Sequence, residues 1–357
     1  MPRILHCADL HLSEQERDYG LAVLREIVDL TNGAEAELLL FAGDVFDSYA
    51  DMSSLRIPFR AELERARRAC RIMMIPGNHE LLRPGPTPIT AMGFGRAELL
   101  AATPFDRREA AGVEIIAIPH QGSYAGYRDW PLPPRGELPR LALAHAALAG
   151  VAYLGPQQEE GGSAMDVDLL VRLEVDYAAM GHLHESRTVR EGRMQASYPG
   201  SARVWRRGEY GARGVNLLEL GAQSSLSRLP LRLAGEYHSL VVPLDLTGLL
   251  PELSGVWGEH DYLDVELCGL VEDERAAEAA REELRRRYGG AVRRLEVSTD
   301  GVTPVAGVAA NPLAQRFVEL WRERRAELEQ QHGEQVARRV LEVGLRKIRA
   351  ALGGGGR

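Results

Sequence analysis

The feature that most constrains the fold is a series of short apolar runs in the N-terminal half of the chain, each followed by a polar or glycine-containing turn. Continuous apolar runs of four to seven residues are typical of strands that are buried on both faces. Between the first two runs, Leu21, Leu24 and Ile27 recur at helical spacing, and residues 55–70 also predict a helix. This alternation predicts a layered α/β domain. The runs are Ile4–Ala8, Leu38–Ala42, Ile72–Ile75, Val113–Ile118, Leu141–Ala144 and Tyr177–Met180.

Polar residues able to bind a metal follow five of these runs. In open α/β sheets, ligands gather at the carboxyl ends of the strands. Each residue taken alone has a structural explanation: Asp9 could cap a turn, Asn78 could form one, and His145 could be a buried core histidine. Their recurrence at successive strand ends favours a shared site. The residues are Asp9, His11, Asp44, Asp47, Asn78, His79, Glu80, His145, His182 and His184.

The ligand types indicate which metals this site would bind. Carboxylate, amide and imidazole groups without thiolate favour borderline-hard divalent ions over a cysteine-type structural zinc, and the three cysteines share no metal-binding spacing. We expect two ions, with Mn²⁺ preferred and Fe²⁺, Zn²⁺ or Mg²⁺ as the alternatives. Two such ions can clamp the attacking and leaving oxygens of an in-line phosphoryl displacement.

The five blocks also resemble, in order across residues 9–184, the signature of the calcineurin-like metallophosphoesterases: Asp-x-His, Gly-Asp-x-x-Asp, Gly-Asn-His-Asp/Glu, a lone His, and Gly-His-x-His. The resemblance implies a four-layer αββα sandwich in the α/β class. It implies that Asp44 bridges two metals and that His79 contacts the scissile phosphate without binding a metal. Asp47 and Glu80 would support the ligands. One metal would be bound by Asp9, His11, Asp44 and His184, and the other by Asp44, Asn78, His145 and His182.

A narrower resemblance is to the SbcD-type DNA repair nucleases. The segment Ile4–Leu12 resembles their Leu-His-Thr-Ser/Ala-Asp-Trp-His-Leu-Gly start, although Leu10 replaces the Trp and Ser13 the Gly. Tyr198–Ser201 followed by Gly208-Glu209 resembles the strand and turn after their last metal block. This resemblance implies a homodimeric 3′–5′ exonuclease and endonuclease of DNA repair. Its C-terminal helices would bind an SMC-like ATPase subunit of the SbcC type.

Three parts are expected: a phosphoesterase core at 1–235, a small α+β DNA-binding cap at 236–305, and a helical docking tail at 306–357. In the cap, Tyr262–Leu267 alternates as a half-exposed strand, a charged helix follows at about 272–288, and a second strand lies near Val292–Val297. In the tail, Pro312 opens two helices broken at Gly333. Residues 313–357 hold ten Lys and Arg against six Asp and Glu. A basic amphipathic tail favours docking, and a terminal helix packed on its own domain is the alternative.

Other functions were weighed against this one. The net charge of −8 argues against a protein that coats nucleic acid non-specifically, and the absence of a signal peptide or a long apolar run predicts a soluble, cytoplasmic protein without membrane contact. The rival enzyme is a phosphodiesterase or phosphatase for a small nucleotide or nucleotide-lipid. A scaffold with a decayed site is disfavoured because the ligand set is complete. His6 and His120 are interpreted as structural and Cys7 as a buried apolar filler.

Overall fold

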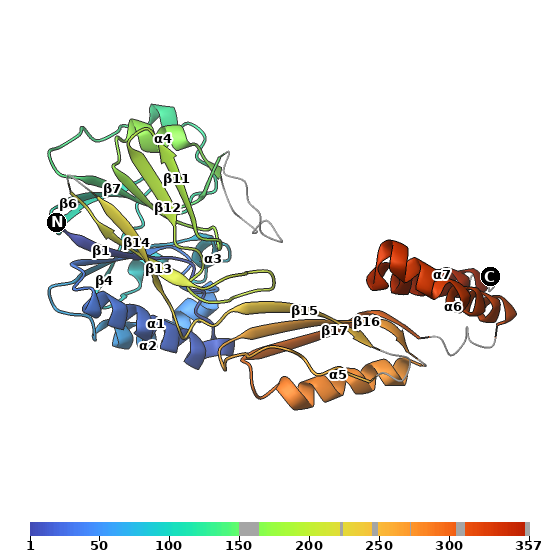
Figure 1. Ribbon diagram of the computed structural model, residues 1–357. Helices are drawn as coiled ribbons and strands as arrows, with labels where there is room; N and C mark the ends of the chain where they lie inside the picture. Colours follow the sequence, from blue (N-terminus) through green and yellow to red (C-terminus); the bar gives the residue numbers. More distant parts are fainter. Residues whose placement is uncertain (150–163, 222–223, 245–248, 272, 305–310, 354–357) are drawn as a thin grey trace. The chain divides into compact units, whose positions relative to one another are not determined.

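The computed structural model describes residues 1–149, 164–221, 224–244, 249–271, 273–304 and 311–353 (Figure 1). The chain divides into two compact units, Met1–Tyr237 and His238–Arg357. The predicted boundary between cap and tail, at residues 305 and 306, lies outside the described residues. In the part of the chain that the structure describes, every helix is too short or too polar to cross a bilayer.

Two six-stranded sheets form the first unit. The first sheet has the order β14-β13-β1-β2-β3-β4, and the second has the order β11-β12-β10-β7-β6-β5. The inner strands pair in parallel, whereas β13, β14, β5 and β11 are antiparallel to a neighbour. The strands are β1 (Arg3–Cys7), β2 (Leu38–Ala42), β3 (Arg71–Ile75), β4 (Ala97–Leu99), β5 (Asp106–Ala110), β6 (Val113–Ile118), β7 (Arg140–His145), β10 (Tyr177–Gly181), β11 (Arg187–Glu191), β12 (Met194–Tyr198), β13 (Gly214–Glu219) and β14 (Ser225–Pro230); a separate pair is β8 (Ala147–Leu148) with β9 (Ala164–Met165).

The two sheets pack face to face because their inner strands are apolar on both sides. In β2, Leu39 and Phe41 pack in one core with helices α1 (Arg17–Gly33) and α2 (Tyr49–Leu63). Leu38 and Leu40 of the same strand pack in a second core with residues of β7 and β10. Helix α4 (Val167–Arg172) covers the outer face of the second sheet, on the side away from α1 and α2 (Figure 1). The layers therefore run α, β, β, α, which confirms the predicted fold class.

The six apolar runs are strands β1, β2, β3, β6, β7 and β10, displaced by no more than one residue from the predicted bounds. The predicted helix at 55–70 is wrong at both ends, since α2 spans Tyr49–Leu63. Its start is set by Ser48, whose side chain accepts a hydrogen bond from the backbone N–H of Asp51 (3.1 Å). Beyond its end, the Arg96 guanidinium donates to the carbonyls of Arg67 (2.8 Å) and Cys70 (3.0 Å), and so stabilises a turn in place of further helix.

The second unit contains a three-stranded sheet in the order β15-β16-β17, formed by β15 (Tyr237–Leu244), β16 (Tyr262–Val271) and β17 (Arg294–Pro304). Strands β16 and β17 are parallel and joined by helix α5 (Glu274–Tyr288), which confirms the predicted β-α-β unit. The prediction that Tyr262–Leu267 is half-exposed was wrong. Only Glu266 of these six residues is exposed, and the Arg294 guanidinium lies 4.9 Å from the centre of the Tyr262 ring.

Helices α6 (Pro312–His332) and α7 (Glu334–Gly353) form a hairpin that breaks at Gly333, as predicted. Gly333 has a φ of +84°, a conformation that favours glycine. Ala314 of α6 and Leu345 of α7 pack against Leu270 of β16, so the hairpin contacts the sheet of its own unit. The assignment of the sheet as a DNA-binding cap and of the hairpin as a docking tail stays a prediction.

Candidate metal centre

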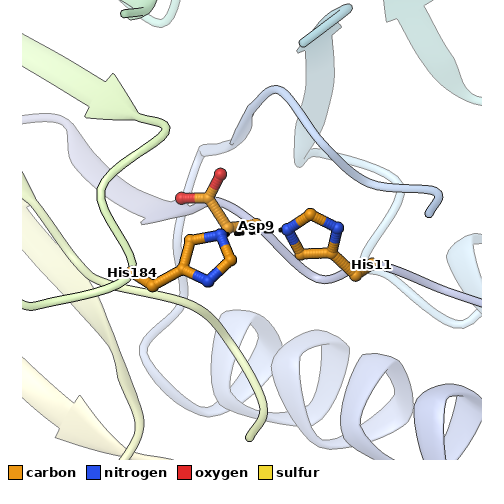
Figure 2. A group of neighbouring side chains, drawn as sticks. All are labelled: Asp9, His11 and His184. Atoms are coloured by element: carbon orange, nitrogen blue, oxygen red, sulfur yellow. Dashed lines mark hydrogen bonds between the residues drawn. The ribbon is translucent and has the colours of Figure 1, made fainter. Parts of the chain in front are cut away.

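The residues predicted to bind metals lie at the carboxyl ends of strands in both sheets. Asp9 and His11 follow β1, Asp44 follows β2, and Asn78 and His79 follow β3. From the second sheet, His145 ends β7, and His182 and His184 follow β10. All are buried except His79, which is half-buried. Figure 2 shows Asp9 and His11 from one sheet facing His184 from the other.

Two glycines allow the strand ends to approach each other this closely. A Cβ atom on Gly181, at the end of β10, would lie 1.8 Å from the carbonyl oxygen of Ala42 at the end of β2. A Cβ atom on Gly43 would lie 2.2 Å from Nδ1 of His145, and Gly43 also has a φ of +84°. Any larger residue at either position would push the two sheets apart at the site.

The backbone of the ligand loops is itself unusual. Seven residues other than glycine have a positive φ in the part of the chain that is described, and four of them belong to the site: Asp9 (53°), His11 (45°), Asp44 (49°) and His182 (97°). Such conformations cost about 1–3 kcal/mol each and persist only where surrounding contacts hold them. Here the backbone N–H groups of Asp9 and His11 donate to the carbonyls of Gly43 and Asp44, at 3.1 and 3.0 Å. The loops after β1 and β2 therefore hold each other in place.

The first candidate ion position lies among Asp9, His11 and His184, whose ligand atoms are all within 4.8 Å of one another. The two Nε2 atoms of His11 and His184 are 3.1 Å apart. Burial, together with the neighbouring His79 and His184, holds the pKa of His11 well below its usual value, so this ring is neutral. Two nitrogens that each lie about 2.1 Å from one ion have this separation at roughly a right angle. The donor set therefore fits a divalent cation.

The second candidate position lies among Asp44, Asn78, His145 and His182. Oδ1 of Asn78 is 2.9 Å from Nε2 of His145 and 3.2 Å from Nδ1 of His182. Nδ1–H of His145 donates to the Ala42 carbonyl (2.7 Å), which directs Nε2 toward the carboxylate of Asp44 at 3.3 Å. Burial alone would lower the pKa of His145, but the Asp44 and Asp9 carboxylates raise it to about 10. Nε2 of His145, Oδ1 of Asn78 and the Asp44 carboxylate thus converge, as the ligands of one cation would.

Asp44 lies between the two positions. Its Oδ1 accepts the backbone N–H of His79 (2.9 Å), and its buried Oδ2 lies 3.3 Å from Nε2 of His145. It belongs to two of the three candidate ligand groups that these residues form, once with Asp9 and His145 and once with His11 and His79. A buried carboxylate is costly unless hydrogen bonds or a cation balance its charge. This position fits the bridging role predicted for Asp44, and the individual ligand roles stay predictions.

Three motif residues are not predicted ligands: the predicted catalytic His79 and the predicted supporting residues Asp47 and Glu80. His79 donates from Nδ1–H to the backbone carbonyl of Asp47 (2.8 Å). One carboxylate oxygen of Asp47 lies 3.3 Å from Nδ1 of His11, so Asp47 contacts a predicted ligand. Glu80 accepts the backbone N–H groups of Phe46 (3.0 Å) and Gly77 (2.8 Å) and so ties the second motif loop to the third.

Two residues that reasoning from the sequence did not assign also contact the site. The Trp205 indole stacks on the ring of His11, with centroids 4.1 Å apart and an interplanar angle of 9°. Glu209 accepts a short hydrogen bond from Nδ1 of His184. Gly208-Glu209 belongs to one of the blocks that resemble the SbcD-type nucleases, whereas Trp205 lies in no motif. His6 is fully buried and donates to the Met180 carbonyl (3.1 Å), in keeping with a structural role.

A family model described as calcineurin-like phosphoesterase matches residues 2–186, which is the segment that contains every predicted ligand. Among solved structures, a dimetal phosphatase from Danio rerio is 11% identical, with a TM-score of 0.45, over 64% of this chain and 98% of that one. A protein of Thermus thermophilus is 14% identical, with a TM-score of 0.40, over 65% of this chain and 99% of that one. An archaeal phosphodiesterase is 12% identical, with a TM-score of 0.36, over 64% and 99%.

Proposed function

The chain belongs to the calcineurin-like phosphoesterase family, whose members are metal-dependent phosphoester hydrolases, and from this premise we propose that it is a two-metal nuclease of DNA repair. It would hydrolyse phosphodiester bonds as a 3′–5′ exonuclease and endonuclease. The observation that supports this most is that two candidate ligand groups share Asp44, one with Asp9 and His145 and the other with His11 and His79. A single-metal phosphatase site would need neither the shared carboxylate nor the second group.

The residues of the candidate metal centre would have different roles in hydrolysis. Divalent cations held by the two ligand groups would supply Lewis-acid activation of the phosphoryl group and of a water molecule. His79 is oriented by donating from Nδ1–H to the Asp47 carbonyl (2.8 Å), so its Nε2 can carry the proton that the leaving oxygen needs. The burial of Asp9, Asp44 and Asn78, all at 0% exposure, excludes bulk water from the ligand atoms.

Mn²⁺ is the proposed physiological metal, with Fe²⁺, Zn²⁺ and Mg²⁺ as alternatives. Carboxylate and amide oxygens from Asp9, Asp44 and Asn78 suit harder ions, and the histidine nitrogens suit softer ones. Mn²⁺ tolerates both kinds of ligand, which is the reason for preferring it.

DNA is preferred over a small substrate because of the second unit. A small nucleotide ester needs neither an added β-α-β sheet nor a helical hairpin. The hairpin and β15 line a groove of about 870 Å³ that contains Phe317 and Val340, and Val336 and Val241 on its rim are 46% and 64% exposed. Apolar residues exposed in such a groove suit a partner protein, and we propose that this partner is an SMC-like ATPase subunit of the SbcC type. The active particle would be a homodimer.

An assay of the purified protein with Mn²⁺ tests this function. The substrates are end-labelled single- and double-stranded DNA beside bis-p-nitrophenyl phosphate, each with and without a chelator. The proposal predicts metal-dependent cleavage of both DNA and the small ester. Cleavage of the ester without any degradation of DNA would instead support the small-substrate phosphodiesterase.

A further inference from the structure

Glu209 is a buried carboxylate at the edge of the metal centre, outside the segment that the family model matches. One of its oxygens accepts the short hydrogen bond from Nδ1 of His184. The other accepts the backbone N–H groups of Trp205 (2.8 Å) and Arg206 (3.3 Å). Glu209 therefore joins a predicted metal ligand to the loop that carries Trp205.

The contact with His184 decides which ring nitrogen carries the proton. Because a carboxylate only accepts hydrogen bonds, Nδ1 of His184 must be the donor. In the neutral ring, Nε2 then carries the lone pair, and this atom faces Nε2 of His11 at 3.1 Å. A metal can bind His184 through Nε2 only in this tautomer.

The contact between Glu209 and the loop also affects His11, the second histidine of the same candidate ion position. Trp205 stacks on His11 with its ring centre 4.1 Å away, so the loop limits how far the His11 ring can rotate. A buried arginine in the same loop, Arg203, donates from Nε to the Leu10 carbonyl (2.8 Å), beside His11. Arg213 donates to the Ser201 hydroxyl (3.0 Å) and the His184 carbonyl (3.3 Å). The segment 201–213 thus holds both histidines of one candidate ion position.

We propose that Glu209 is a positioning residue of the metal centre, which sets the tautomer of His184 and holds Trp205 against His11. The inference rests on the metal centre of the proposed function and adds a residue that the ligand motifs do not include. Its effect is expected at one of the two ion positions, the one formed by Asp9, His11 and His184.

Glu209→Gln is the variant that tests this role, because it keeps the size of the side chain and removes one acceptor. Three N–H donors face Glu209, and a glutamine offers a single acceptor oxygen to them. Its amide N–H₂ next to His184 would favour the tautomer protonated at Nε2. Glu26→Gln is the matched control, since Glu26 also accepts two backbone N–H groups, those of Arg232 (2.8 Å) and Leu233 (2.9 Å). Glu26 belongs to none of the predicted ligand motifs.

Two readouts separate a positioning role from a purely structural one. ¹⁵N NMR of the metal-free protein should show His184 protonated at Nδ1 in the wild type and in Glu26→Gln, and at Nε2 in Glu209→Gln. Calorimetric titration with Mn²⁺ should show one of two sites weakened by about 10- to 100-fold in Glu209→Gln alone. An unchanged tautomer together with wild-type affinity at both sites would overturn the assignment. The NMR readout needs no metal, so it tests the role of Glu209 independently of ion binding. A wild-type protein that binds no Mn²⁺ would refute the proposed function and leave the NMR test of Glu209 valid.

Discussion

At the scale of single residues, the geometry of the site depends on which ring nitrogen of each histidine donates a hydrogen bond to the surrounding protein. Nδ1 of His145 donates to the Ala42 carbonyl, Nδ1 of His79 to the Asp47 carbonyl, and Nδ1 of His184 to Glu209. In all three rings the acceptor behind Nδ1 leaves Nε2 as the atom that serves the site. The protein matrix therefore orients the same ring nitrogen, Nε2, of three histidines toward the site before any ligand binds.

His79→Ala tests the proposed proton donor. We expect a loss of about 10²–10⁴-fold in DNA hydrolysis, because the leaving alkoxide needs a proton. The loss on bis-p-nitrophenyl phosphate should be much smaller, since p-nitrophenolate is a weak base that leaves without one. Steady-state rates on the two substrates, with the metal content measured by plasma mass spectrometry, check this. Equal losses on both substrates, or loss of bound metal, would show that His79 is a ligand, as its place in one candidate group allows.

Glu114 gives a prediction about pH. Burial alone would raise the pKa of Glu114, but hydrogen bonds from Arg140 (2.7 Å) and Arg107 (2.5 Å) outweigh it and lower the pKa below its usual value. Its contribution to stability is therefore complete above the unfolded pKa of about 4.3 and is lost as pH falls through the lower folded value. Glu114→Gln should reduce the free energy of unfolding by about 3 kcal/mol at pH 7, because Arg140 stays buried.

Urea unfolding of wild type and Glu114→Gln from pH 7 down to pH 3 measures this difference. The gap between the two proteins should shrink toward the acid end, where the wild-type carboxyl also becomes neutral. A gap that stays constant with pH would mean that the ion pair with Arg140 adds nothing to stability.

The sequence predicted the cluster of candidate ligands and the supporting residues Asp47 and Glu80, but not the contacts that Glu209 and Trp205 make. Asp9, Asn78 and His184 lie in short blocks with fixed spacing after apolar runs. Residues that directly follow such strands lie at the carboxyl edge of the sheet, where ligands bind. Glu209 and Trp205 come from an irregular loop, where neither periodicity nor spacing says which way a side chain points. Their contacts depend on how that loop closes onto β1 and β10, which is a property of the folded protein.

At the scale of elements, six inner strands were predictable because they are continuous apolar runs, whereas the edge strands and the inner strands β12 and β13 were not. The edge strand β14 (Ser225–Pro230) is exposed or half-exposed along its whole length, and its inner neighbour β13 has a polar residue, Asn216, within its sequence. The start of α2 was also missed, since it depends on the cap formed by Ser48 rather than on helical periodicity. Sequence patterns thus locate elements that are buried on two sides better than those at a sheet edge or a helix end.

Gly181→Ala tests whether the close approach of β10 and β2 builds the site. The added methyl group would overlap the Ala42 carbonyl, which also accepts the hydrogen bond from His145. We expect the free energy of unfolding to fall by about 1–3 kcal/mol or more, and metal affinity to fall as His145 moves. Gly122→Ala is the control, because a Cβ atom there meets nothing within 4 Å. Chemical unfolding and Mn²⁺ titration of both variants measure this, and equal behaviour of the two would contradict it.

At the scale of the whole molecule, the proposal assigns catalysis to the first unit and partner binding to the second. On α7, Val336, Val340 and Val343 are 46%, 40% and 37% exposed and recur at the spacing of one helix face. They line the groove that also contains Phe317 of α6. Phe317 also belongs to the cluster that packs the hairpin on Leu270 of its own sheet, whereas the three exposed valines do not.

Val340→Glu tests the docking surface without removing the hairpin. A charge in the apolar groove should abolish co-purification with an SMC-like ATPase subunit and leave Mn²⁺-dependent ester hydrolysis within about twofold of the wild type. Ile57→Glu is the control, since Ile57 is equally apolar and 67% exposed on α2 in the first unit. Pull-down of co-expressed proteins measures binding. Undiminished binding by Val340→Glu would mean that the ATPase subunit contacts another surface.

The central claim is that the site at the carboxyl ends of strands in both sheets binds a pair of divalent cations, and anomalous diffraction from crystals grown with Mn²⁺ tests it most directly. The account predicts two anomalous peaks about 3.5–4 Å apart, with the Asp44 carboxylate between them. One peak should contact Asp9, His11 and His184, and the other Asn78, His145 and His182. A single peak, or peaks elsewhere on the protein with this site empty under saturating Mn²⁺, would contradict the account.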